Sequence, residues 1–185
     1  MRITVYSGSF SPLHIGHLAI MEYLSAWEGT DWTYLVVSPQ NPFKDASSAG
    51  SSTRRYRAAL ATLQRHPGLR VWLDDIELRM PPPSYTIRTL DTLRRQEPDN
   101  EFTLVIGGDN LDAIRRWKDY RRILKEYGVA VYPRSGYDSV ALRADLLMED
   151  PAYRITLLDC PTVDMSSTQI REAAARGESV DDWLM

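Results

Sequence analysis

The sequence holds a single cysteine and has no long apolar run, and each scarcity excludes a class of protein. Cys160 alone can form neither an internal disulfide scaffold nor a cysteine-built zinc site. No apolar run approaches the ~18 residues that a membrane span needs. Strand-like residues begin directly after Met1, which leaves no room for a signal peptide. We therefore expect a cytoplasmic protein without a membrane partner.

An excess of positive charge is also lacking. Lys and Arg number 22 against 25 Asp and Glu, which gives a formal net charge of −3. A broad basic face for DNA or RNA is therefore not expected, and any anion must be bound by a few local groups. At 185 residues, with 43% hydrophobic and 25% charged residues, the chain has the size and composition of one globular domain spanning 1–185.

Strand-like and helix-like segments alternate along the whole chain. The expected strands are 2–7, 33–38, 69–73, 102–108, 128–133 and 154–159. The expected helices are 15–27, 54–66, 84–96, 109–127, about 138–148 and 166–177. This order predicts an α/β protein, a doubly wound parallel sheet in a single domain. Ligands in such sheets bind at the carboxyl ends of the strands, so the loops that follow strands are the candidate sites.

The first of these loops, SGSFSPLHIGH at 7–17, carries two of the three histidines in the chain. Gly8 permits a sharp turn, and Gly16 would let a ligand approach the first helical turn closely. His14 and His17 are three residues apart, so both rings project from the same helix face. The unpaired N–H groups of a helix start attract anions, which favours phosphate binding here. The alternative is a turn whose histidines are satisfied by backbone carbonyls.

A second helix start, VDMSSTQIREAAARG at 163–177, shows a related pattern. Ser166 with Gln169 three residues later forms a capping box, which explains the cap alone. Arg171 lies about one turn into this helix, where a cation opposes the helix dipole and loses ~0.3–1 kcal/mol unless an anion compensates. Both helix starts follow strands, so they are expected at one edge of the sheet, where they could hold one polyphosphate between them.

These two segments resemble the paired signatures of the H-x-G-H nucleotidyltransferase superfamily. The first is G-x-F-x-P-x-H-x-G-H at 8–17, and the second is S-S-T-x-I-R at 166–171. Class I aminoacyl-tRNA synthetases share the HIGH element, but this chain lacks their length and basic surface. The resemblance implies a Rossmann-like fold and catalytic roles for His14, His17 and Arg171. The ATP-binding residues that it implies are Gly8, Ser9, Phe10, Gly16, Ser167, Thr168 and Arg171.

Three further segments resemble the bacterial branch that adenylylates nicotinate mononucleotide: SPQNPFK (38–44), SYT (84–86) and IGGDNLDAIRRW (106–117). The acceptor-binding residues that this resemblance implies are Lys44, Tyr85, Thr86, Asp109 and Trp117. Lys44 would contact the acceptor phosphate, Asp109 the ribose hydroxyls, and Trp117 the pyridine ring. Each also has a simpler interpretation: a solvated loop lysine, a helix cap, and a core tryptophan.

The implied activity is transfer of AMP from ATP to nicotinate mononucleotide, giving deamido-NAD (nicotinate adenine dinucleotide) and pyrophosphate in NAD biosynthesis. A phosphate is already a nucleophile at neutral pH, so the reaction requires positioning and charge stabilisation rather than a general base. Mg²⁺ is expected to arrive with ATP, with no protein metal ligand. Both histidines are expected to be protonated beside a polyanion.

The chain departs from the family pattern at Ser11, at Arg88 and in its short C-terminal tail, so no role is carried over to these positions. Other functions remain open: adenylylation of phosphopantetheine, adenylylation of the amide form of the acceptor, and a non-catalytic nucleotide-sensing module. Assembly into a homo-oligomer is also left open.

Overall fold

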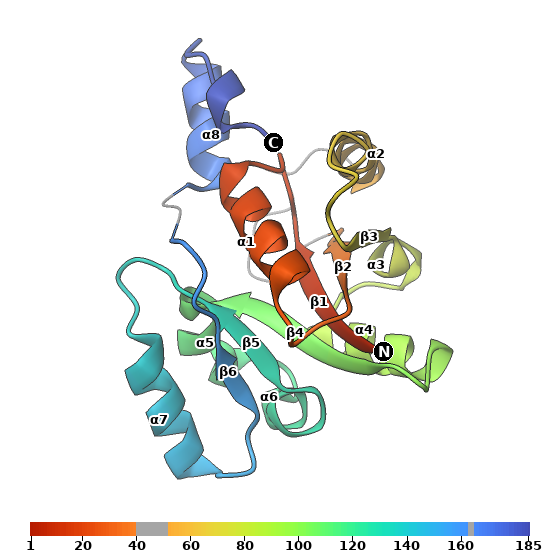
Figure 1. Cartoon of the computed structure of the whole chain (residues 1–185), viewed down its shortest axis with the longest axis vertical. Helices are drawn as coiled ribbons and strands as arrows, with labels where there is room; N and C mark the ends of the chain where they lie inside the picture. Colours follow the sequence, from red (N-terminus) through yellow and green to blue (C-terminus); the bar gives the residue numbers. More distant parts are fainter. Residues whose placement is uncertain (40–51, 163–164) are drawn as a thin grey trace.

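The computed structural model describes residues 1–39, 52–162 and 165–185 of the chain. Six strands form one sheet in the order β3-β2-β1-β4-β5-β6, and every pairing is parallel (Figure 1). The strands are β1 (Arg2–Gly8), β2 (Trp32–Val37), β3 (Val71–Asp74), β4 (Glu101–Gly107), β5 (Val129–Tyr132) and β6 (Ile155–Leu157). All six predicted strands are confirmed, and so is the doubly wound sheet.

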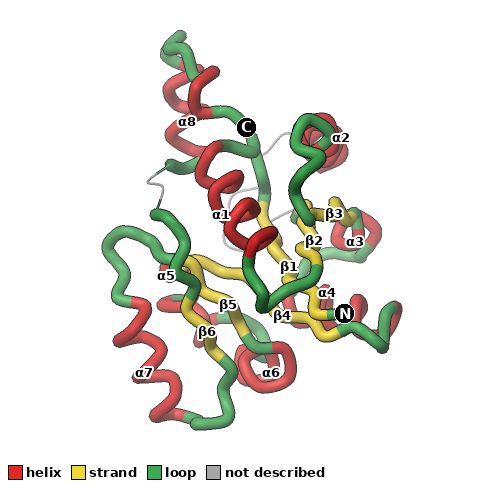
Figure 2. The backbone as a smooth tube through the Cα atoms, viewed as in Figure 1, coloured by secondary structure: helices red, strands yellow, loops and turns green. Residues whose placement is uncertain are grey.

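Helices alternate with strands along the chain, as the red and yellow segments of Figure 2 show. The α-helices are α1 (Ile15–Ala26), α2 (Ser52–Leu63), α3 (Ile76–Arg79), α4 (Thr86–Gln96), α5 (Gly108–Asp112), α6 (Tyr120–Arg122), α7 (Ser139–Glu149) and α8 (Ser167–Ala175). Shorter helical turns are η1 (Ile114–Arg116), η2 (Ile123–Tyr127) and η3 (Asp181–Trp183). The short helix α3 was not predicted, because four residues are too few for a helical pattern to emerge.

The sheet is buried on both faces because successive side chains of a strand point to opposite sides. Val5 packs into a core with α4, α5 and η2, whereas its neighbour Tyr6 packs into a second core with α1 and α2. Leu104 and Val105 on β4 divide between the two cores in the same way. This explains why the central strands read as continuous apolar runs.

The helix predicted over 109–127 is wrong as a single element. The chain there is divided into α5, η1, α6 and the π-helical turn η2. The interruption lies at 117–119, where Trp117 is extended and Asp119 takes a left-handed φ of 53°. A left-handed non-glycine residue cannot continue a right-handed helix. The break frees Trp117 from helical geometry.

The order of the strands reverses between β1 and β4, which lie side by side at the centre of the sheet. A crevice forms at such a point because the connections leave the two strands toward opposite faces. Among the described residues, no helix combines the length and the apolar character required to cross a membrane.

Candidate nucleotide-binding site

The start of α1 is capped by two histidine rings. His14 is the N-cap, and its Nδ1 accepts the Gly16 backbone N–H at 3.2 Å. His17 returns the contact, since its Nδ1 accepts the His14 backbone N–H at 3.2 Å. The ring centroids lie 3.7 Å apart, with the two planes tilted by 31°. An Nδ1 that accepts a hydrogen bond carries no proton, so each neutral ring has its proton on Nε2 and can donate from there.

Both rings have pKa values below the ordinary value in the described structure, and their protonation beside a bound polyanion stays a prediction. Burial, together with the nearby charge of Arg134, lowers the pKa of His14 from 6.5 to about 4. The pKa of His17 is held well below its ordinary value by burial, then by His14 and Arg134. Desolvation disfavours the imidazolium form of each ring. The alternative in which backbone carbonyls satisfy the histidines fails, because backbone N–H groups are their partners.

Arg134 is a site residue that sequence reasoning did not single out. With His14, His17 and Gly16 it lines a small cavity of about 20 Å³. Its Nε lies 3.7 Å from Oδ1 of Asp109, an oxygen that is buried and makes no hydrogen bond in the described structure. The sequence signal was available, because Arg134 lies in a loop that follows a predicted strand.

Phe10 packs against the histidine pair. Its ring meets that of His17 edge-on, with centroids 5.1 Å apart. The backbone of Phe10 has a φ of 42°, an unfavourable value for a residue with a side chain. A Cβ on Gly8 would lie 3.0 Å from the Phe10 ring, a tight contact that would require the ring to shift slightly.

Helix α8 docks onto the main chain of the 8–17 loop, as Figure 1 shows for the red and blue ends of the chain. Ser167 Oγ donates to the Pro12 carbonyl at 3.1 Å. Arg171 donates to the Ser11 carbonyl at 2.6 Å and to Thr168 Oγ1 at 3.1 Å. The predicted convergence of the two segments is thus confirmed as geometry. Arg171 contacts the loop itself and is not among the residues that line the small cavity.

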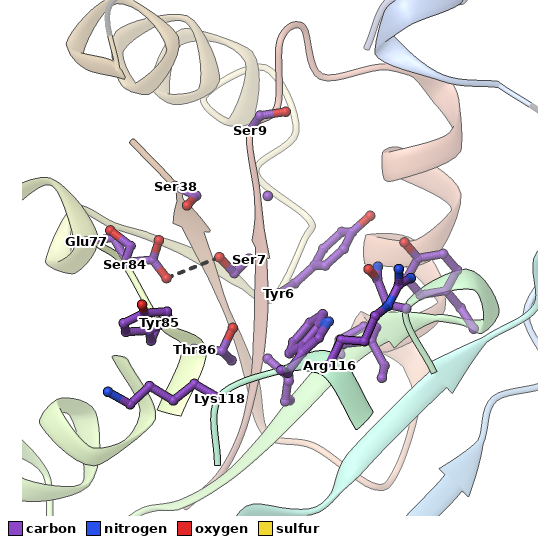
Figure 3. A pocket seen from close by; sticks show the side chains of 17 residues that line it. Tyr6, Ser7, Ser9, Ser38, Glu77, Ser84, Tyr85, Thr86, Arg116 and Lys118 are labelled. Carbon is purple, nitrogen blue, oxygen red and sulfur yellow. Dashed lines mark hydrogen bonds between the residues drawn. The ribbon is translucent and has the colours of Figure 1, made fainter. Parts of the chain in front are cut away.

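A larger cavity of about 560 Å³ opens at the carboxyl ends of β1 and β4, beside the small one. Tyr6 and Tyr132 line both cavities. Of the predicted residues, Gly8, Ser9, Tyr85, Thr86 and Trp117 line the large cavity. Figure 3 shows Tyr85, Thr86 and Lys118 around it. Lys44 lies outside the described residues.

The first turn of α4 forms one wall of this cavity. Tyr85 is the N-cap residue of α4 and Thr86 is its first helical residue. No side chain caps this helix start, which leaves its backbone N–H groups available for an anionic group. The Lys118 ammonium lies 4.7 Å from the centre of the Tyr85 ring. Trp117 both packs against the core and lines the cavity. Its interpretation as a core residue is therefore compatible with its interpretation as a ligand contact.

Glu77 is a second residue that sequence reasoning missed, and it lines the large cavity with Ser7, Ser38 and Ser84. Only 3% of it is exposed. The nearest sequence signal was its place in 74–85, a loop following a strand, but nothing in that segment distinguished one acidic residue from its neighbours.

The departures from the family pattern have structural counterparts. The Ser11 carbonyl, rather than its side chain, receives Arg171. Arg88 donates to the carbonyls of Pro81 and Pro83 and so fastens the segment before α4. Leu184 in the tail forms an antiparallel bridge with His14. The short tail therefore reaches the histidine pair.

Within the described ranges, no three or more His, Cys, Asp or Glu side chains gather closely enough to hold a metal ion. A carboxylate cage is the usual arrangement for a resident Mg²⁺ or Ca²⁺.

Fold and site together define a nucleotide-binding α/β protein of the cytidylyltransferase-like class, and the family model of that description matches residues 5–173. A probable nicotinate-nucleotide adenylyltransferase of Bacteroides fragilis is 39% identical over 180 residues, covering 97% of this chain and 85% of that relative. One of Azobacteroides pseudotrichonymphae is 37% identical, covering 100% and 92%. The chain belongs to the nicotinate-nucleotide adenylyltransferase family.

Solved structures agree with the fold. The Plasmodium falciparum nicotinic acid mononucleotide adenylyltransferase complexed with NaAD superposes with a TM-score of 0.78, covering 99% of this chain and 90% of that chain. The same Plasmodium enzyme complexed with APC gives a TM-score of 0.77. Sequence identities of 17% and 16% make this a likeness of fold alone.

Proposed function

We propose that residues 1–185 form one nucleotidyltransferase domain that transfers AMP from ATP to nicotinate mononucleotide, giving nicotinate adenine dinucleotide and pyrophosphate in NAD biosynthesis. The observation that carries this proposal is the docking of α8 onto the 8–17 loop, beside a cavity large enough for a nucleotide. Membership of the family supports it, and so does the complex of the Plasmodium enzyme with NaAD.

In the reaction, a 5′-phosphate oxygen of the acceptor forms a bond to the α-phosphorus of ATP, and the bond to the leaving pyrophosphate breaks. His17 donates from Nε2 to the α-phosphate, and His14 donates to the ATP phosphates. Because both donors are desolvated and already oriented by their caps, they stabilise developing charge without reorganising. Arg134 adds a positive charge beside them, and a bound polyphosphate would raise the pKa of both rings.

The remaining ATP contacts come from both helix starts. Gly8, Ser9, Phe10 and Gly16 shape the loop that faces the nucleotide. Arg171, with Ser167 and Thr168, holds the loop and approaches the leaving phosphates once ATP is bound. Mg²⁺ enters as part of the ATP substrate, coordinated by phosphates and water.

The acceptor occupies the large cavity. Its carboxylate meets backbone N–H groups at the start of α4 near Thr86, and its ring lies between Tyr85 and Trp117. Asp109, whose carboxylate is partly exposed, bonds the ribose hydroxyls. Lys44 completes the site at the acceptor phosphate. A cytoplasmic location, the lack of a nucleic-acid partner and the state of assembly remain predictions.

Pyrophosphate release from MgATP tests this function with three acceptors: nicotinate mononucleotide, its amide analogue and phosphopantetheine. We expect release with the nicotinate form and slower release with the amide. Release with phosphopantetheine alone would overturn the choice of acceptor. Binding of ATP without release for any acceptor would instead favour a nucleotide sensor, which needs affinity but no stabilised transition state.

A further inference from the structure

The carboxylate of Glu77 is a buried negative charge in the wall of the large cavity. Its Oε1 accepts from Thr89 Oγ1 at 2.9 Å and from Ser7 Oγ at 3.4 Å, the second contact being the dashed line of Figure 3. Its Oε2 is buried and has no hydrogen-bond partner in the described part of the chain. The carboxylate thus links the end of β1 to α4 through Oε1.

The groups around Glu77 are hydroxyls rather than cations. Burial raises the pKa of Glu77, and hydrogen bonds from Ser38, Thr89 and Ser7 oppose that rise. No ion pair joins Glu77 to a Lys or Arg within the described ranges, in contrast to the salt bridges of surface carboxylates such as Asp75. A buried charge without a counter-ion is costly, so a cationic ligand would relieve the cost.

The proposed acceptor carries such a charge. The nitrogen of its pyridine ring is bonded to ribose and is therefore a pyridinium cation. Tyr85 and Trp117 also line the cavity, and aromatic rings favour a flat cation that stacks on them. Lys118 and Arg116 line the cavity too, so its wall carries both positive and negative charge. The pyridinium ring would therefore have to lie on the side of the cavity that Glu77 forms.

We propose that Glu77 is a specificity-determining residue, which selects acceptors with a positively charged aromatic ring by supplying the buried counter-charge. This inference rests on the proposed function, since it assumes that the pyridine nucleotide occupies the large cavity. The interaction is electrostatic and involves a carboxylate that is itself buried, so salt screens it less than it screens an exposed pair. It therefore acts on the ring charge and leaves the shape and stacking of the ring to Trp117.

A neutral isostere separates charge from shape. In the C-nucleotide with a 3-carboxyphenyl ring, benzene replaces pyridinium and the carboxylate and phosphate stay in place. Calorimetric titration of the wild type should give at least about tenfold tighter binding of nicotinate mononucleotide than of this isostere. In Glu77→Gln the preference should fall to within about twofold, because the affinity for the cationic ligand drops while that for the isostere is kept.

Asp75→Asn is the matched control, since it removes an equal charge from an exposed carboxylate two residues away. This variant should keep the tenfold preference, and its loss there would contradict a specific role for Glu77. Equal weakening of both ligands in Glu77→Gln would show a merely structural link between Ser7 and Thr89 and would overturn the proposal.

The wild-type comparison can overturn the inference even if Glu77→Gln does not fold. Equal binding of both ligands by a wild-type protein that releases pyrophosphate overturns this inference alone. Failure of the wild type to bind either ligand overturns the proposed function and this inference together. A retained preference in folded Glu77→Gln would assign the selection to the aromatic walls instead.

Discussion

The helices α1 and α8 start with the same local device and use it differently. Each opens with a reciprocal capping box, His14 with His17 and Ser166 with Gln169. The serine box is self-contained, because Ser166 and Gln169 bond each other through both main chain and side chain. The histidine box uses only Nδ1 of each ring and keeps a second nitrogen for a ligand.

The surroundings of the two starts differ as well. His14 is 4% exposed, whereas Thr168 lies at the surface. Donors in a desolvated place interact more strongly with a phosphate than donors in water. Helix α8 contributes mainly by holding the carbonyls of Ser11 and Pro12. The comparison assigns charge stabilisation to α1 and positioning to α8, and variants at each start can test this division.

The largest effect is expected at His17. Replacing it with Ala removes a desolvated donor to the α-phosphate and should lower kcat by about 10²–10⁴-fold with a smaller change in KM. Steady-state pyrophosphate release measures both constants. His66, the remaining histidine, lies outside both cavities, and His66→Ala should leave the rate unchanged. A His17→Ala enzyme with near-normal kcat would remove α1 from the chemistry.

A second test uses the buried state of His14. Its pKa is about 4 in the folded protein against 6.5 for the free side chain, so the unfolded chain binds more protons between these values. Stability is therefore retained above pH 6.5 and lost as the pH falls toward 4. The loss amounts to at most about 3 kcal/mol.

His14→Asn keeps a side chain that can cap the helix but removes this titration. Urea unfolding at pH 7 and pH 4 should show a smaller decline for His14→Asn than for the wild type. Equal declines in the two proteins would mean that His14 is not desolvated, and the contrast with the exposed start of α8 would disappear.

The sheet and the two helix starts could be predicted from the sequence. The strands carry unbroken apolar runs, and the ends of α1 and α8 are marked by residues with local geometric roles. His14 and His17 could be proposed as site residues because they lie within such a local pattern, and Thr86 because SYT resembles a family motif. Glu77 could not be found, because its importance comes from Thr89 and Ser7, which meet it only through the fold.

Trp117 shows a second limit of sequence reasoning, because the segment around it was predicted as the wrong element. The apolar spacing in 109–127 resembles a helix, but the extended Trp117 and the left-handed Asp119 break it. A non-glycine residue in this conformation is rarely signalled by its own identity. Protonation was beyond sequence as well, since the low pKa of both histidines follows from burial and from Arg134, a residue more than a hundred positions away.

A smaller catalytic effect is expected from α8. Arg171→Ala removes a charged donor to the Ser11 carbonyl and should lower kcat/KM by about 10–100-fold, mainly through KM for ATP. Arg176→Ala on the same helix removes an exposed pair with Glu178 and should change neither constant. A loss confined to kcat in Arg171→Ala would give α8 the chemical role that the comparison assigns to α1.

The smallest effect is expected at the cap of α8. Ser166→Ala removes the side chain that accepts the Gln169 N–H and should lower the free energy of unfolding by about 1 kcal/mol. Because Ser167 and Arg171 hold the 8–17 loop by their own contacts, kcat should stay within about twofold of wild type. Ser179→Ala, at an exposed serine beyond the helix, is the control and should change neither quantity. A large fall in kcat for Ser166→Ala would show that the serine box is not self-contained. The structure of this helix start would then affect the positions of the reacting phosphates.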